Sequence, residues 1–227
     1  METRGRSESS TPINPPHPKV LTSSSPKTQY LILYNFCSAI AWLVVLGRVL
    51  LLVPLVGFGR TYKGVGTFAK WTQTMALLEV VHAATGIVRA PISTTLMQVA
   101  SRILLVWPVT NTFPHLAKSA AYSSMLIAWS VTEVIRYSYF TLSLSGFTPK
   151  FMTWLRYNAF YVLYPLGISS ECWLIYKAIE PAKSIRQEYA WLLQAILGIY
   201  VPGSYILFTH MMRQRRKVMR GKQVKKA

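Results

Sequence analysis

Two side chains that could exchange protons lie seven residues apart in an apolar stretch of the chain. Tyr164 and Glu171 belong to the segment LRYNAFYVLYPLGISSE, residues 155–171. Seven residues turn an α-helix by about 700°, so both side chains would share one face, with Cα atoms about 10 Å apart. They could bracket a small reacting group as general acid and general base. The spacing alone also allows a packing contact for Tyr164 and an ion pair between Glu171 and Arg156 or Arg136.

The residues between this pair affect its geometry. Pro165 and Gly167 both weaken a helix, proline because it lacks the backbone N–H and glycine because of its conformational freedom. A kink at these residues would change the separation of Tyr164 and Glu171 and would free backbone groups for binding. We therefore expect any bend in this helix at Pro165 or Gly167.

Other charged residues lie in or beside the apolar stretches: Arg48, Arg102, Arg136, Arg156, Glu79 and Glu133. Buried charges need partners, because an unpaired buried charge is unfavourable. Glu133 and Arg136 are three residues apart and can pair on one helix face, either to orient the helix or to line a site. Gln98 and Arg102 also share a face. Arg102 then needs a glutamate, a ligand carboxylate or a ligand phosphate, unless it reaches the membrane surface from a helix end.

The elements that would position these residues are membrane helices. The chain has 227 residues, of which 52% are hydrophobic and only 14% charged, against roughly 25% charged in a soluble domain. It contains no aspartate, its formal net charge is +18, and its last fifteen residues, RQRRKVMRGKQVKKA, are strongly basic. This composition predicts an all-α integral membrane protein.

A membrane-spanning helix needs about 20 mostly apolar residues. The chain holds six such stretches, at residues 30–58, 68–87, 94–112, 120–144, 151–179 and 189–212, with a glycine-rich loop expected at 57–66. We predict a bundle of six transmembrane helices over residues 29–212, between a disordered tail of residues 1–28 and a basic tail of residues 213–227. An even number of spans puts both termini on one side, and the basic tail favours the cytosol.

The sequence lacks the motifs of several other kinds of site. His82, His115 and His210 do not form the clustered motifs of a metal centre, so no metal site is expected. The two cysteines, Cys37 and Cys172, predict neither a disulfide framework nor a zinc site, and neither opens a Cys-x5-Arg phosphatase motif. A transporter would be expected to show internal repeats, and none is evident.

Two long motifs carry a family resemblance. The segments WSVTEVIRYSYF and LRYNAFYVLYPLGISSE, with LEVVHAATGIVRAPISTTLMQVASRI upstream, resemble the 3-hydroxyacyl-CoA dehydratases of very-long-chain fatty acid elongation. This family includes the proteins called protein-tyrosine-phosphatase-like, and the resemblance covers about residues 30–212. It implies six helices in the endoplasmic reticulum membrane with both termini cytosolic. It implies Tyr164 and Glu171 as the catalytic pair. The supporting or substrate-binding positions that it implies are Gln98, Arg102, Glu133, Arg136, Arg156, Tyr157 and Gly167.

The implied reaction removes water from a (3R)-3-hydroxyacyl-CoA to give a trans-2-enoyl-CoA, the third step of elongation. It needs a base for the C2 proton and an acid for the C3 hydroxyl, and the resemblance leaves open which residue is which. CoA belongs to the substrate, so no cofactor is expected, and its phosphates would lie near Lys150, Arg89 or the basic tail. Expected partners are membrane lipid and the elongase, 3-ketoacyl-CoA reductase and enoyl-CoA reductase, with no nucleic acid. The alternative is a catalytically silent scaffold of the elongation complex or of another membrane signalling complex.

Overall fold

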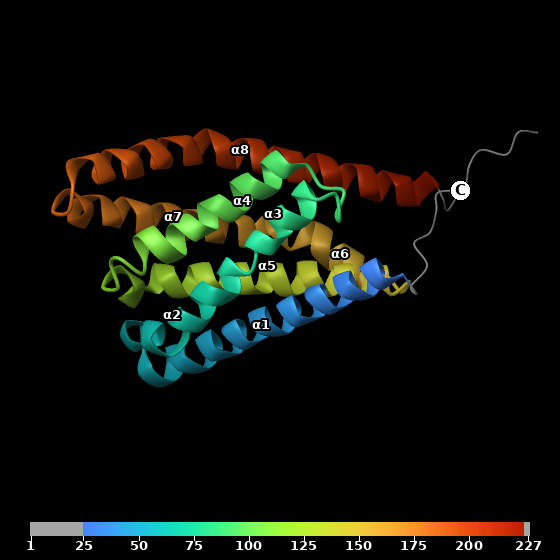
Figure 1. Ribbon diagram of the computed structural model, residues 1–227, viewed down its shortest axis with the longest axis horizontal. Helices are drawn as coiled ribbons and strands as arrows, with labels where there is room; N and C mark the ends of the chain where they lie inside the picture. The colour runs from blue at the N-terminus through green and yellow to red at the C-terminus, as the bar shows by residue number, and fades with distance from the viewer. Residues whose placement is uncertain (1–24, 225–227) are drawn as a thin grey trace, which may run out of the picture.

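The computed structural model describes residues 25–224, and this part of the chain is helical with no strand (Figure 1). Its elements follow in the order α1 (Pro26–Val56), α2 (Phe58–Thr74), α3 (Leu77–Ala84), α4 (Ile92–Leu104), the π-helix η1 (Leu105–Val109), the 3-10 helix η2 (Leu116–Lys118), α5 (Ala120–Leu144), α6 (Lys150–Asn158), α7 (Phe160–Lys183) and α8 (Gln187–Val224). The predicted all-α class is therefore confirmed for the described residues.

The long helices define the bundle. α5 packs against α1 and α7, and α7 packs against α8, so that α5 and α7 lie between α1 and α8 (Figure 1). The shorter helices α2, α3 and α4 run obliquely across them in this view. The start of α1 and the end of α8 lie at the same end of the bundle, near α6 (Figure 1). This arrangement agrees with an even number of passes through the bundle.

Helix α1 begins earlier than predicted. The side chain of Ser25 accepts a hydrogen bond from the backbone N–H of Thr28 at 3.3 Å, which caps the helix. Pro26 occupies the first turn, where its missing N–H has no helical partner to lose. Residues 26–28, which the sequence predicted as part of a disordered tail, thus belong to α1. The rest of that prediction, for residues 1–24, lies outside the described residues.

The predicted loop at residues 57–66 was wrong. Gly57 ends α1 with a φ of 74°, a conformation that glycine adopts readily, but α2 then begins at Phe58. Glycine costs about 1 kcal/mol relative to alanine inside a helix, and close packing on α1 explains its presence here. A Cβ at Gly64 would lie 2.6 Å from Cδ1 of Leu52, so only glycine allows this approach without a shift of the leucine.

Two predicted helices are interrupted and one is confirmed. The stretch 68–87 divides between α2 and α3, and the stretch 151–179 divides between α6 and α7. The second break lies at Ala159, beside Asn158, whose side chain donates to the carbonyl of Trp154 at 2.7 Å. Helix α7 continues through Pro165 and Gly167 without a break in its helical assignment. Helix α5 covers the predicted stretch 120–144.

The remaining helices differ from prediction mainly at their ends. The stretch 94–112 is helical up to residue 109, and residues 110–112 form a turn. Helix α4 passes into η1, where Pro108 lacks a donor and the N–H of Thr110 bonds five residues back to the carbonyl of Leu105 at 2.9 Å. Helix α8 continues past residue 212 to Val224, so the described part of the basic tail is helical.

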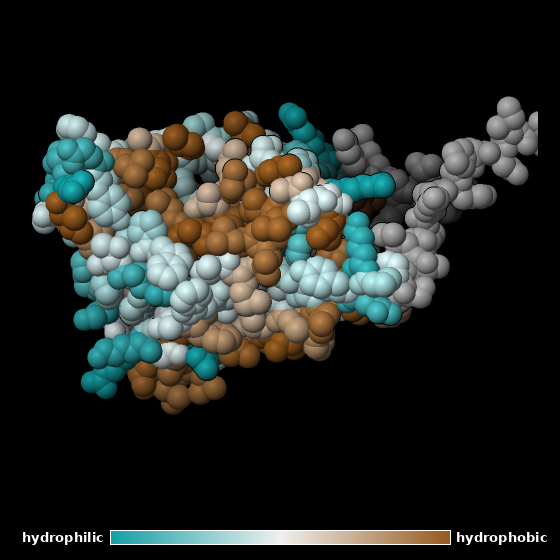
Figure 2. Space-filling view, viewed as in Figure 1, coloured by the Kyte–Doolittle hydropathy of each residue, from teal (hydrophilic) through white to brown (hydrophobic). Residues whose placement is uncertain are grey.

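Three segments in the described range are long and apolar enough to cross a membrane: Pro26–Val56, Ile92–Val109 and Gln187–Arg216. Figure 2 shows hydrophilic side chains at both ends of the long axis and apolar side chains over much of the surface between them. Leu55 of α1 and Ile206 of α8 are among the exposed apolar residues. Such a surface suits contact with lipid, because apolar side chains lose nothing there by being exposed.

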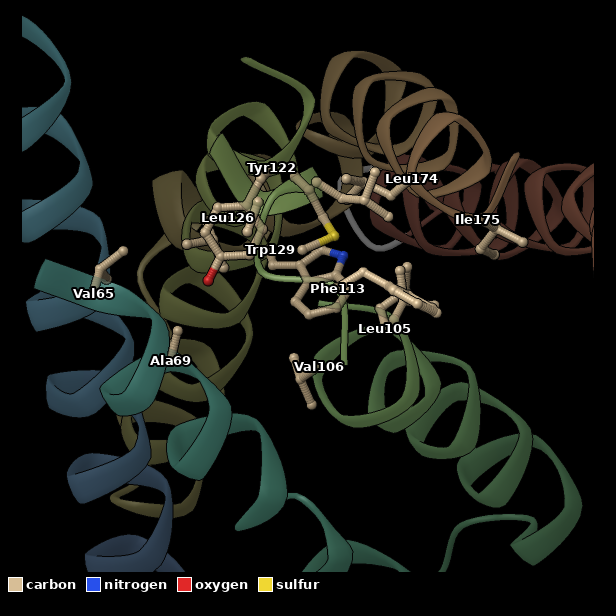
Figure 3. Close-up of a cluster of buried hydrophobic side chains, with 14 of the residues drawn as sticks. Val65, Ala69, Leu105, Val106, Phe113, Tyr122, Leu126, Trp129, Leu174 and Ile175 are labelled. Atoms are coloured by element: carbon tan, nitrogen blue, oxygen red, sulfur yellow. The ribbon is translucent and has the colours of Figure 1, made fainter. Parts of the chain in front are cut away.

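A buried apolar cluster fixes α5 and α7 relative to each other. Figure 3 shows Trp129 and Leu126 of α5 beside Leu105 of η1 and Leu174 of α7. Trp129 is 2% exposed and Leu174 is fully buried. Close packing of this kind tolerates few alternative arrangements. The polar residues that α5 and α7 carry are therefore held in a defined relative position.

Candidate active site

Both carboxylate oxygens of Glu171 accept hydrogen bonds inside the bundle. Glu171 lies on α7 and is 7% exposed. The indole N–H of Trp129 on α5 donates to Oε1 at 2.7 Å, and the hydroxyl of Tyr200 on α8 donates to Oε2 at 3.1 Å. An indole nitrogen can only donate, so Oε1 acts as an acceptor. Two uncharged donors from α5 and α8 thus hold the carboxyl group of Glu171 in one orientation.

The hydroxyl of Tyr164 contacts the same helix α8. It donates to the backbone carbonyl oxygen of Ser204 at 3.0 Å, and its ring lies 5.8 Å from the ring of Phe208. A carbonyl oxygen can only accept, so this phenol carries its proton. Tyr200 and Ser204 are four residues apart and share a face of α8. One face of α8 thus contacts both members of the predicted pair.

Gly167 lies between Tyr164 and Glu171 on the buried face of α7. A Cβ at this position would lie 3.8 Å from Oε1 of Glu171 and 3.7 Å from the Cβ of Ala128, which is ordinary van der Waals contact. A larger side chain would extend further into the space beside the carboxylate. Within residues 25–224, no hydrogen bond joins Tyr164 to Glu171 directly. Gly167 has no side chain, so only backbone lies between the two residues at this position of the helix.

An ion-pair network lies on the neighbouring helices. Glu133 of α5, which is 1% exposed, accepts from Arg102 of α4 and from Nε of Arg136 at 2.6 Å. Nη1 and Nη2 of Arg136 also donate to the two carboxylate oxygens of Glu79 on α3, each at 2.7 Å. Tyr137 donates to Glu79 as well. The predicted pair of Glu133 and Arg136 is confirmed. Of the anions that the sequence allowed for Arg102, the structure shows a glutamate, Glu133.

Arg102 connects this network to Glu171. Its guanidinium carbon lies 5.1 Å from the centroid of the Trp129 ring, and Trp129 donates to Glu171. The positive charge of Arg102 therefore lies next to the group that holds the carboxylate. The spacing had also allowed Arg156 or Arg136 as the ion-pair partner of Glu171. Neither arginine forms a hydrogen bond or an ion pair with Glu171 among the described residues. Arg136 is engaged by Glu133 and Glu79 instead.

Three of the predicted supporting residues lie apart from this network. The guanidinium of Arg156 on α6 contacts the rings of Tyr139 and Phe140, with centroid distances of 4.5 and 4.4 Å. Tyr157 follows Arg156 in the chain, and its ring centroid is 5.9 Å away. Gln98 is exposed on α4, and the structure gives its side chain no hydrogen bond in the described part of the chain. The site residues thus form separate groups around α7.

The described residues contain no group of three or more histidine, cysteine or glutamate side chains that could hold a metal ion. Buried His82 instead bonds through Nε2 to the hydroxyl of Tyr30 at 2.8 Å. Two surface grooves, one around Lys177 and Glu180 and one around Arg213, include none of the predicted site residues. Tyr164 and Glu171 are themselves side chains that can donate and accept a proton.

Sequence reasoning missed three contacts of the site residues. Trp129 lies four residues before Glu133 in the motif WSVTEVIR, so helical spacing could have included it. Glu79 was recognised as a charged residue in an apolar stretch but not as part of the supporting set. Tyr200 lies 29 residues after Glu171 and on another helix, so no local pattern connects them.

Known proteins match most of the chain. The family model described as "Protein tyrosine phosphatase-like protein, PTPLA" matches residues 73–221. A Schizosaccharomyces pombe protein named "Probable very-long-chain (3R)-3-hydroxyacyl-CoA dehydratase" is 43% identical over 85% of this chain and 93% of its own length. "Very-long-chain (3R)-3-hydroxyacyl-CoA dehydratase PASTICCINO 2B" of Oryza sativa is 37% identical over 86% of this chain and 95% of its own.

A mammalian relative extends this pattern. "Very-long-chain (3R)-3-hydroxyacyl-CoA dehydratase 1" of Mus musculus is 35% identical over 87% of this chain and 75% of its own. No solved structure matches the chain. The matches begin upstream of α3 and continue through α8, so they include the ion-pair network and the pair on α7. The chain belongs to the protein tyrosine phosphatase-like family, PTPLA, and the relatives described above carry the name very-long-chain (3R)-3-hydroxyacyl-CoA dehydratase.

Proposed function

We propose that this chain is a hydro-lyase that converts (3R)-3-hydroxyacyl-CoA to trans-2-enoyl-CoA and water, with Tyr164 and Glu171 as the acid–base pair. The names of its relatives support the substrate and the reaction. The observation that carries the assignment is the contrast in hydrogen bonding on α7. Glu171 accepts from two donors, whereas Tyr164 donates to a carbonyl.

This contrast supports one assignment of the roles that the sequence left open. Glu171 is the base, because its oxygens serve as acceptors, and it takes the proton from C2 of the acyl chain. The electron pair of the broken C2–H bond forms the C2–C3 double bond, and the C3–O bond breaks. Tyr164 is the acid, and its phenol protonates the departing hydroxyl to give water. General acid–base groups of this kind contribute about 10²- to 10⁴-fold to a rate.

The enzyme must then restore both groups. After one turnover Glu171 carries the proton from C2, and Tyr164 has lost its own. Transfer of one proton from Glu171 to Tyr164, directly or through the product water, returns the starting state. The reaction is therefore balanced without an oxidant, a reductant or a metal, and we propose that no cofactor is used.

Trp129 and Tyr200 are positioning residues in this scheme. Their hydrogen bonds at 2.7 and 3.1 Å hold the two oxygens of Glu171 from α5 and α8. A base must lie within hydrogen-bond reach of the proton that it abstracts, so its orientation matters as much as its charge. Arg102, stacked near Trp129, places positive charge beside the carboxylate. The ion-pair network in turn holds Arg102 through Glu133.

We also propose that the domain of residues 29–212 crosses the endoplasmic reticulum membrane six times. The passes would be α1, α2 with α3, α4 with η1, α5, α6 with α7, and α8. The shared end of α1 and α8 and the basic residues after 212 support termini in the cytosol. The acyl chain would lie among the helices, and partners would be the elongase and the two reductases of the elongation cycle.

Substitution of the pair tests the proposal in microsomes. Tyr164→Phe and Glu171→Gln should fold yet lose conversion of 3-hydroxyacyl-CoA to enoyl-CoA. Tyr176→Phe is the matched control, since Tyr176 also lies on α7 but is 60% exposed. Near-normal turnover by both site variants would sink the proposal. Rescue of a dehydratase-deficient cell by Tyr164→Phe would favour the scaffold function instead.

A further inference from the structure

Arg156 is a cation without an anionic partner in the described part of the chain. Its guanidinium lies against Tyr139 and Phe140 of α5, at 4.5 and 4.4 Å from the ring centroids. Its Nη1 atom is buried and has no hydrogen-bond partner among residues 25–224. A buried N–H without an acceptor is unfavourable, and a charged one more so. The aromatic faces offset part of this cost, but they do not accept the N–H of Nη1 in the plane of the guanidinium.

No glutamate of the described residues forms an ion pair with Arg156. Glu79 and Glu133 bind Arg136 and Arg102, and Glu171 accepts from Trp129 and Tyr200. The other two, Glu180 and Glu188, lie where α7 ends and α8 begins, at the opposite end of the bundle from α6 (Figure 1). The chain contains no aspartate. An acceptor for Nη1 of Arg156 would therefore be a group outside residues 25–224, such as a bound ligand.

Arg156 lies between the cytosolic end that we assign to the bundle and the proposed catalytic pair. It precedes Tyr164 by eight residues, which corresponds to about 12 Å along a helix axis. The pantetheine arm of an acyl-CoA separates the thioester from the diphosphate, and when extended it covers such a distance. A guanidinium with a free N–H suits a phosphate oxygen, because arginine binds phosphate through directed charge-assisted bonds.

We propose that Arg156 binds a phosphate of the CoA part of the substrate. This inference rests on the proposed function and deepens it, because it assigns the end of the substrate that undergoes no chemistry. With the phosphate bound at Arg156, the pantetheine arm runs along the end of α6 toward Tyr164. The reacting C2–C3 bond then reaches the space beside Gly167.

The test compares two ligands that differ only in the phosphates. A medium-chain saturated acyl-CoA has no hydroxyl to lose, so its dissociation constant reports binding without turnover. The matching acyl-pantetheine thioester lacks the diphosphate and the nucleotide. Both are measured on full-length protein in phosphatidylcholine nanodiscs, with wild type, Arg156→Gln, Arg156→Lys and Arg48→Gln. Arg48 is the matched control because its guanidinium also stacks on a ring, that of Phe68, at 4.8 Å from the centroid. It lies in the second half of α1, away from the end of the bundle that contains α6.

The expected result is specific to one ligand. Arg156→Gln should weaken acyl-CoA binding about tenfold or more, the scale of a hydrogen bond to a charged group, and should leave acyl-pantetheine binding unchanged. Arg156→Lys should fall between wild type and Arg156→Gln, and Arg48→Gln should match wild type. Equal weakening of both ligands by Arg156→Gln, or none, would overturn the proposal.

Two other sources of an acceptor give different results. If a lipid phosphate binds Arg156, Arg156→Gln should change the melting temperature by an amount that depends on the lipid headgroup, with no difference between the ligands. Glu2 and Glu8 lie outside the described residues. If either binds Arg156, the double variant Glu2→Gln, Glu8→Gln should lower the melting temperature as much as Arg156→Gln does. Either outcome overturns the proposal. A wild-type protein that binds acyl-CoA as expected but produces no enoyl-CoA would refute the proposed function and leave this site intact.

Discussion

Removal of the Tyr200 hydroxyl should disable the proposed base without changing the shape of the bundle. This hydroxyl donates to Oε2 of Glu171 at 3.1 Å, and phenylalanine fills the same space without a donor. A hydrogen bond to a charged group contributes about 1.5–3 kcal/mol. Since about 1.4 kcal/mol corresponds to a tenfold change in rate, kcat of Tyr200→Phe should fall by about 10- to 100-fold. KM should change little, because Tyr200 holds Glu171 and not the substrate.

The assay is steady-state conversion of (3R)-3-hydroxyacyl-CoA by purified protein, with the melting temperature measured on the same samples. Tyr205→Phe is the control, because Tyr205 is on the same helix and 72% exposed. A purely structural role for Tyr200 would lower the melting temperature and leave kcat per folded molecule unchanged. Wild-type kcat in Tyr200→Phe would refute the reasoning that this hydroxyl positions the base.

Three further substitutions test the surroundings of Glu171. Trp129→Phe removes the donor at 2.7 Å and should lower kcat by about tenfold or more in the same assay; an unchanged kcat would count against a positioning role. Glu133→Ala leaves two guanidinium groups without their buried partner and should lower the free energy of unfolding by about 3–5 kcal/mol. Denaturant titration measures this, and exposed Glu188→Ala should have no such effect. Gly167→Leu fills the space beside Glu171 and should abolish turnover, whereas Gly167→Ala should still fold because its Cβ makes only ordinary contacts; full activity of Gly167→Leu would show that substrate does not occupy this space.

Local pattern was sufficient where an element is decided by its own residues. Helix α5 was predicted with its observed bounds because a long apolar run lies between Ser119 and Ser145. The pair of Glu133 and Arg136 follows from helical spacing within that run. Helix α2 was missed because its glycines indicate a loop when they are considered alone. Gly64 lies close to Leu52 of α1, and no local pattern contains that approach.

The candidate site shows the same division. Tyr164 and Glu171 were predicted as a pair because they would share one face of one helix, whereas Gly167 was implied by the family resemblance. That Arg102 needs an anion also followed from its apolar surroundings, but its choice of Glu133 depends on how α4 packs against α5. The contacts of α8 with Tyr164 and Glu171 join residues 40 and 29 positions apart. Only the packing of α7 against α8 brings those residues together.

The central claim is that this chain dehydrates 3-hydroxyacyl-CoA with Tyr164 and Glu171. The most direct measurement is mass-spectrometric detection of trans-2-enoyl-CoA after purified wild-type protein in lipid nanodiscs is given (3R)-3-hydroxyacyl-CoA, with a metal chelator present and no redox cofactor added. The account predicts enoyl-CoA from wild type and from Tyr176→Phe, and product reduced by at least about 100-fold in Tyr164→Phe and in Glu171→Gln. Absence of product from wild type, or wild-type rates in both variants, would contradict it.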